Sequence, residues 1–154
     1  MNVPALVAPV PVAVKVSSPV PAAPTLYGIA TVVLDDADRI GDGSRAICFS
    51  KRTLEIFDRL GVGDAALAKG VEWQKGRVFH RDRELYDFDL LPEHGHKMPA
   101  FINLQQFYAE AYLVDRVQEL AAIDLRWRNK VTGLEQRNDH AVLTVATPDG
   151  PYWI

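Results

Sequence analysis

Proline places the strongest constraint on how this 154-residue chain can fold. Six of its ten prolines lie in the first 25 residues, where Lys15 is the single charged side chain and Val and Ala dominate the rest. Proline has no backbone N–H and a fixed φ, so this density opposes both helices and central strands. We therefore expect residues 1–25 to form an extended or disordered tail and residues 26–154 to hold the ordered domain.

Charge and cysteine content exclude several classes of protein. The net charge of −3 provides no basic field for a nucleic acid partner. Prolines interrupt the apolar tail and Lys15 comes late in it, so neither a membrane span nor a secretory signal is expected. Cys48 is the only cysteine, which excludes an intramolecular disulfide framework and is typical of a reducing, cytoplasmic location.

After the tail, the hydrophobic pattern predicts an α/β fold with an antiparallel portion, because strands and helices follow one another along the chain. Ser50 is a suitable N-cap for a helix over residues 51–60, and Gly61 is a suitable stop for it. The segments "DLRWRNKVTGLEQ" and "AVLTVATPDG" are each predicted to be a strand, joined by a turn at residues 137–140. The other expected elements are strands at 29–36, on both sides of a polar turn at 81–83, at 101–104 and at the final "PYWI", and helices at 64–70 and 105–122.

Two glycine patterns fit the G-x-G-x-x-A form of a dinucleotide-binding loop. The first, "GVGDAA" at residues 61–66, follows a helix instead of a strand, which favours a helix end and a turn. The second, "GDGSRA" at residues 41–46, is separated from the preceding strand by residues 36–40, where the fingerprint needs a tight turn. Both patterns are therefore weak indications of a nucleotide site.

Metal ligands and catalytic residues are not assigned. The pair of histidines in "HGH" at residues 94–96 could bind a metal, yet no pattern of further ligands supports it and a solvated loop is favoured. Cys48 has no partner pattern for nucleophilic catalysis, and the sequence holds no Ser-His-Asp elbow.

Basic side chains gather around the start of the helix expected at residues 51–60. Arg45, Lys51 and Arg52 lie near a terminus that is already electropositive, where a cation costs about 0.3–1 kcal/mol. We therefore expect a negative group nearby. Arg45 with Ser44 could bind phosphate, or Arg45 could be a solvated surface cation. Asp35 ends a strand, where an acid either accepts hydrogen bonds from a ribose or stabilises a turn.

Three longer segments carry a resemblance to a known family. The stretches "VVLDDADRIGDGSRAICFSKRTLEIFDRLGVGD", "FDLLPEHGHKMPAFINLQQFYAEAYLVDR" and "DLRWRNKVTGLEQ" resemble the FAD-dependent aromatic hydroxylases, over roughly residues 26–152. The resemblance implies a partial Rossmann-like FAD/NAD(P)-binding domain. It implies a flavin cofactor reduced by NAD(P)H, and a monooxygenation that uses O₂ to hydroxylate a phenolic acid such as 3-(3-hydroxyphenyl)propanoate.

The same resemblance assigns site residues. It places Asp35 on the adenosine ribose of FAD and Arg45, with Ser44 beside it, on the pyrophosphate. It places Gln106, and with it Gln105, near the phosphate and ribityl region of the flavin. The anion expected near the helix start would then be the pyrophosphate, while Lys51 and Arg52 add background field.

The sequence also departs from the family pattern at both ends. The family's first strand and its glycine loop are not recognisable, and the proline-rich tail stands in their place, so we expect an unpaired edge beside the strand at 29–36. Two hypotheses follow. The chain is either the FAD-binding fragment of an NAD(P)H-dependent flavin monooxygenase, inactive alone, or a non-catalytic α/β module that binds a nucleotide or a partner.

Overall fold

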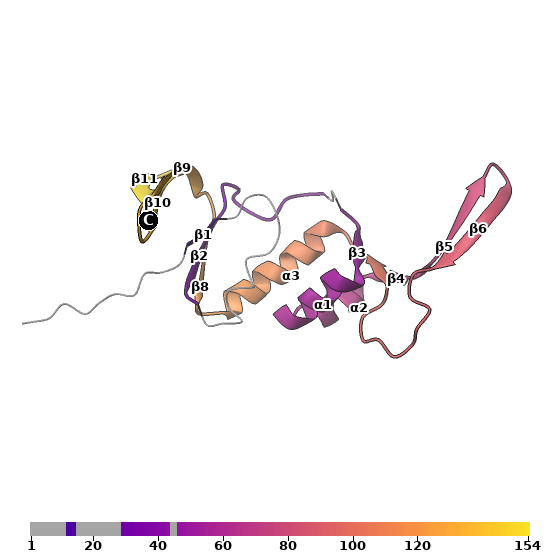
Figure 1. Ribbon diagram of the computed structural model, residues 1–154. Helices are drawn as coiled ribbons and strands as arrows, with labels where there is room; N and C mark the ends of the chain where they lie inside the picture. Colours follow the sequence, from indigo (N-terminus) through magenta and orange to yellow (C-terminus); the bar gives the residue numbers. More distant parts are fainter. Residues whose placement is uncertain (1–11, 15–28, 44–45) are drawn as a thin grey trace, which may run out of the picture. The chain divides into compact units, whose positions relative to one another are not determined.

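A computed structural model describes residues 12–14, 29–43 and 46–154 of the chain (Figure 1). It contains two compact units, which we describe separately. Unit 1 combines the described residues up to Gly41 with Val114–Ile154, and unit 2 is formed by Asp42–Leu113. The helix α3 (Gln106–Glu119) begins in unit 2 and ends in unit 1.

A parallel three-stranded sheet is the first half of unit 1. Its strand order is β1-β2-β8, and both pairings are parallel. The central strand is β2, whose four side chains are all buried, as expected for a β-branched run between two neighbours. The strand predicted at 29–36 is thereby confirmed. The bounds are β1 (Val12–Val14), β2 (Thr31–Leu34) and β8 (Ile123–Arg126).

The position of β1 corrects one expectation about the tail. Val12 pairs with Val32 in parallel register, so β2 has a neighbour where an unpaired edge was expected. The strand is three residues long and lies at the edge of the described sheet, a place where neighbouring prolines are tolerated. Residues 1–11 and 15–28 lie outside the described residues, so the extended or disordered tail stays a prediction for them.

An antiparallel sheet with the order β11-β10-β9 is the second half of unit 1. Leu143 and Val145 of its central strand share a buried cluster with Val32 and Leu34 of β2, so the two sheets have a common core. The turn expected at residues 137–140 is confirmed, since the N–H of Arg137 donates to the carbonyl of His140 at 2.8 Å. The bounds are β9 (Lys130–Gln136), β10 (Ala141–Thr147) and β11 (Gly150–Trp153).

The segment "DLRWRNKVTGLEQ" was expected to be one strand, and this prediction is wrong. The structure divides it into β8 of the parallel sheet and β9 of the antiparallel sheet. Between them lies a turn in which Arg128 has a φ of 58°, a left-handed conformation that is uncommon outside glycine. This turn lies beside the end of β2.

Unit 2 is built on a short antiparallel sheet with the order β3-β7-β4. Ile102 of the central strand is fully buried and lies against Gly70 at the end of α2. The helix α1 buries Leu54, Phe57 and Leu60, the face that its helical spacing predicts. The bounds are β3 (Cys48–Ser50), α1 (Lys51–Leu60), α2 (Gly63–Lys69), β4 (Val71–Trp73) and β7 (Phe101–Asn103).

The limits of α1 follow its sequence signals. Gly61 ends the helix with a φ of 85°, and its N–H donates to the carbonyl of Asp58, so the predicted stop is confirmed. Ser50 occupies the N-cap position, but its hydroxyl lies 3.3 Å from the hydroxyl of Thr53 and makes no capping bond. The N–H of Lys51 instead donates to the carbonyl of Ala100 at 2.8 Å.

A two-stranded hairpin, β5 (Lys75–His80) and β6 (Arg83–Asp89), extends from the short sheet of unit 2 (Figure 1). The predicted pair of strands around a polar turn is confirmed. Every residue of β6 is exposed, although Tyr86 and Phe88 alternate with acids as in a half-buried strand. The ring of Phe88 covers Gly76 on the partner strand and leaves no space there for a Cβ.

Candidate functional site

Asp35 lies at the carboxyl end of the central strand β2, where it leaves the parallel sheet. Its N–H donates to the carbonyl of Arg126 at 3.0 Å, and its carbonyl accepts from the N–H of Asn129 at 2.8 Å. Its carboxylate oxygen Oδ1 accepts from the N–H of Ala37 at 2.9 Å, which forms a local turn. Ligands of open α/β sheets bind at this edge, so the position suits an acid that accepts hydrogen bonds from a ribose.

Gln105 and Gln106 lie at the start of α3, in unit 2. Gln105 is exposed, and its carbonyl accepts from the N–H of Tyr108 at 3.0 Å. Gln106 is the first residue of the helix, and its Nε2 donates to Oε1 of Glu110 at 2.7 Å. The first turn of α3 carries no acid, so its N–H groups and dipole favour an anion. Gln106 therefore opens the helix as predicted, while its contact with a cofactor stays a prediction.

Ser44 and Arg45 lie outside the described residues, but the structure describes the residues that follow them, from Ala46 on. The carbonyl of Ile47 accepts from the N–H of Leu104 at 2.7 Å, and Cys48 pairs with Asn103 in the antiparallel register of β3 and β7. The residues that follow Arg45 therefore run beside the residues that precede Gln105. The strand pairing therefore places Ile47 next to Leu104, the residue that precedes Gln105.

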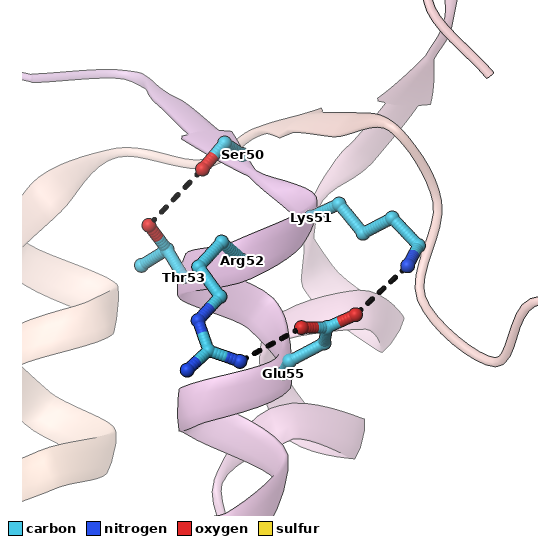
Figure 2. A network of polar contacts seen from close by, with 5 residues as sticks. All are labelled: Ser50, Lys51, Arg52, Thr53 and Glu55. Atoms are coloured by element: carbon cyan, nitrogen blue, oxygen red, sulfur yellow. Dashed lines mark hydrogen bonds and ion pairs between the residues drawn. The ribbon is translucent and has the colours of Figure 1, made fainter.

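The basic start of α1 has its own anion, which the sequence reasoning missed. Figure 2 shows Glu55 between Lys51 and Arg52 on the first turns of the helix. Lys51 Nζ lies 2.8 Å from Glu55 Oε1, and Arg52 Nη1 lies 3.2 Å from Oε2. The hydrogen bond from Lys51 first, and that from Arg52 second, hold the pKa of Glu55 below its ordinary value. The spacings i,i+4 and i,i+3 were visible in the sequence and would have identified this pairing.

The pattern "GVGDAA" is explained by helix packing. Gly61 is the left-handed cap of α1, and Gly63 begins α2 so close to Asp58 that an added Cβ would lie 2.6 Å from its Cα. The predicted helix end and turn are therefore confirmed. His94 and His96 are exposed in a loop, and the described part of the chain holds no group of three or more potential metal ligands. Within that same part, no helix is long and apolar enough to cross a membrane.

Comparison with protein families gives a match over most of the chain. The model of a family described as "FAD binding domain" matches residues 25–151. A flavin-dependent monooxygenase of Mycobacteroides abscessus is 30% identical over 135 residues, which cover 82% of this chain and 28% of that protein. A 3-(3-hydroxy-phenyl)propionate/3-hydroxycinnamic acid hydroxylase of Burkholderia vietnamiensis is 31% identical over 132 residues, covering 83% of this chain and 23% of that protein.

Solved structures give the same fold. The p-nitrophenol 4-monooxygenase of Pseudomonas putida matches with a TM-score of 0.75 at 21% identity, over 83% of this chain and 33% of that one. The anhydrotetracycline hydroxylase of Streptomyces rimosus matches with a TM-score of 0.68 at 29% identity, over 83% of this chain and 25% of that one. The chain thus spans about a quarter of the length of the curated relatives it matches.

Proposed function

This chain belongs to the FAD binding domain family, and on that premise we propose that it supplies the nucleotide-binding part of an NAD(P)H-dependent flavin monooxygenase. The proposed substrates are phenolic acids, with 3-(3-hydroxyphenyl)propanoate as the first candidate, since one relative is named for that compound. The expected fold, α/β and Rossmann-like with an antiparallel portion, agrees with the sheets of the structure and with its structural neighbours.

The placement of Asp35 is the observation that carries the proposal. A carboxylate at the end of the central parallel strand, held by the N–H of Ala37, suits the hydroxyls of an adenosine ribose. The acid-free start of α3 with Gln106 suits a phosphate or ribityl oxygen. These donors and acceptors fit the groups that FAD presents. When bound, FAD supplies the oxygen chemistry, and the chain's own residues bind and orient it.

One part of the sequence fits FAD less well. The strand β1 is followed by residues 15–27, which contain no glycine, whereas a dinucleotide loop needs glycines for close approach of its backbone to the pyrophosphate. Ser44 and Arg45 are therefore proposed to hold the pyrophosphate through the arginine fork, without that loop. Weaker binding than in a protein with a glycine loop is expected.

The test is a titration of the purified chain with FAD, followed by flavin fluorescence and visible absorption. Asp35→Asn and Arg45→Ala should each raise the Kd about tenfold or more, because hydrogen bonds to charged groups contribute about 1.5–3 kcal/mol. Matched controls are Asp36→Asn beside the acid and Arg52→Ala, whose cation is paired with Glu55. Equal affinity of all four variants would refute the assigned roles.

The second stage of the test concerns chemistry. NADH or NADPH oxidation that depends on 3-(3-hydroxyphenyl)propanoate, with one oxygen transferred to the ring, would support the monooxygenase. FAD binding without such turnover would support an FAD-binding fragment that is inactive alone. A folded chain that does not bind FAD would instead favour the non-catalytic α/β module.

A further inference from the structure

The turn between β8 and β9 follows the backbone of Asp35 closely. Asp35 bonds through both of its backbone groups, to the carbonyl of Arg126 and the N–H of Asn129. The N–H of Arg128 donates to the carbonyl of Ala37 at 2.8 Å, and Ala37 in turn donates to the Asp35 carboxylate. The direction of the carboxylate therefore depends on the shape of this turn.

The turn adopts a conformation that needs support. Arg128 has a φ of 58°, which costs free energy in a residue other than glycine. The side chain of Asn129 supplies the support, because its Nδ2 donates to the carbonyl of Trp127 at 2.7 Å. Its Oδ1 accepts from the hydroxyl of Tyr152 at 2.7 Å. Both ends of the Asn129 amide are thus engaged, one within the turn and one with β11.

Tyr152 is itself held in place. Its hydroxyl accepts from Arg126 Nη1 at 3.1 Å, and Arg126 forms an ion pair with Asp124 at 2.6 Å. The hydrogen bond to Asp124 first, and that to Tyr152 second, raise the pKa of Arg126 above its ordinary value. The side chain of Tyr152 packs against the cluster of Val32 and its neighbours, and its hydroxyl contacts Asn129 of the turn.

We propose that Tyr152 and Asn129 are positioning residues for nucleotide recognition, acting through the turn to orient the Asp35 carboxylate toward the ribose hydroxyls. The proposal rests on the proposed function. In this proposal a residue of β11 affects FAD affinity, although β11 is distant from β2 in the sequence and no local motif indicates such a role. Neither residue touches the nucleotide in this scheme; each acts through the backbone that holds Asp35.

The experiment uses the full chain and Tyr152→Phe, which removes the hydroxyl and keeps the ring in the core. FAD affinity is measured in the wild type, Tyr152→Phe, Asp35→Ala and the double variant. Loss of one hydrogen bond that orients the acid should raise the Kd about three- to tenfold in Tyr152→Phe. Because Asp35→Ala leaves no carboxylate to orient, the second substitution should add less than about a twofold change in that background.

A merely structural role for the hydroxyl would weaken FAD binding by the same factor in both backgrounds, and that result would overturn the proposal. So would an unchanged Kd in Tyr152→Phe. Tyr86→Phe, on the exposed strand β6, is the matched control and should leave the Kd unchanged. A control variant that weakens binding as much as Tyr152→Phe would also count against the proposal.

Amide hydrogen exchange separates this proposal from the proposed function. In Tyr152→Phe, exchange at the N–H groups of Ala37 and Asn129 should accelerate, while Leu143, bonded to Ile154 in the antiparallel sheet, should keep its protection. Unchanged exchange at the N–H of Ala37 would refute the role of Tyr152 in holding the turn, even if the chain binds FAD. A wild-type chain that binds no FAD would refute the proposed function and the nucleotide role together, and the exchange rates would still decide whether the turn holds Asp35.

Discussion

The contact between Gly63 and Asp58 gives a prediction whose sign is set by two opposed effects. Gly63→Ala replaces glycine at the first position of α2, where alanine is intrinsically favoured by up to about 1 kcal/mol. The new Cβ, however, would lie 2.6 Å from the Cα of Asp58 and 2.8 Å from its N, both backbone atoms of α1. Ordinary contact begins near 3.4 Å, so α1 and α2 would have to separate by most of an ångström.

Overpacking of this kind costs about 1–3 kcal/mol, which exceeds the gain in helix propensity. We therefore expect Gly63→Ala to lower the free energy of unfolding by about 1–2 kcal/mol, measured by urea denaturation with circular dichroism. Gly41→Ala is the matched control: nothing lies within 4 Å of its added Cβ, so its effect should stay within about 0.5 kcal/mol. A Gly63→Ala variant as stable as the wild type would refute the packing explanation of "GVGDAA".

Two further predictions concern the core and the charges of unit 2. Ile102→Ala empties a fully buried position in the central strand β7 and should cost about 2–5 kcal/mol in urea denaturation; a loss below about 1 kcal/mol would contradict its central place in the packing. Lys51 and Arg52 lower the pKa of Glu55, so the stability they confer is present above its ordinary value of 4.5 and is lost as pH falls through the lowered pKa. NMR titration should give Glu55 a midpoint below 4.5 that rises in Lys51→Met, and a midpoint unchanged by that substitution would contradict the pairing.

Elements with strong local signals could be predicted closely from the sequence. The helix α1 begins after Ser50 and ends at Gly61, because a helix stop in the left-handed region depends on the residue at that position alone. The hairpin of β5 and β6 was found in the same way, from two β-rich runs around a polar turn. Its burial was not predictable, because alternation of apolar and acidic residues says nothing about what covers the apolar face.

Elements that depend on distant contacts could not be predicted. The division between β8 and β9 occurs at Arg128, where no glycine or proline marks a turn. The left-handed residue is tolerated because Asn129 and Tyr152 hold the turn, and Tyr152 lies 23 positions beyond Asn129 in the chain. The pairing of β1 with β2 was missed for a related reason. The number of prolines argues against a strand in the tail as a whole, but the three proline-free residues of β1 suffice for an edge pairing.

The charges of α1 show how a local pairing changes a functional argument. The sequence led us to expect a negative group near the three cations around the helix start, and Glu55 supplies one within the helix itself through its ion pairs with Lys51 and Arg52. The case for a bound phosphate then rests on Arg45 and on the acid-free start of α3. The β3–β7 register brings Ile47 and the strand that follows it beside Leu104, the residue before Gln105. The proposed phosphate contact therefore involves fewer cations than charge counting indicated, and a single substitution at Arg45 is its most direct test.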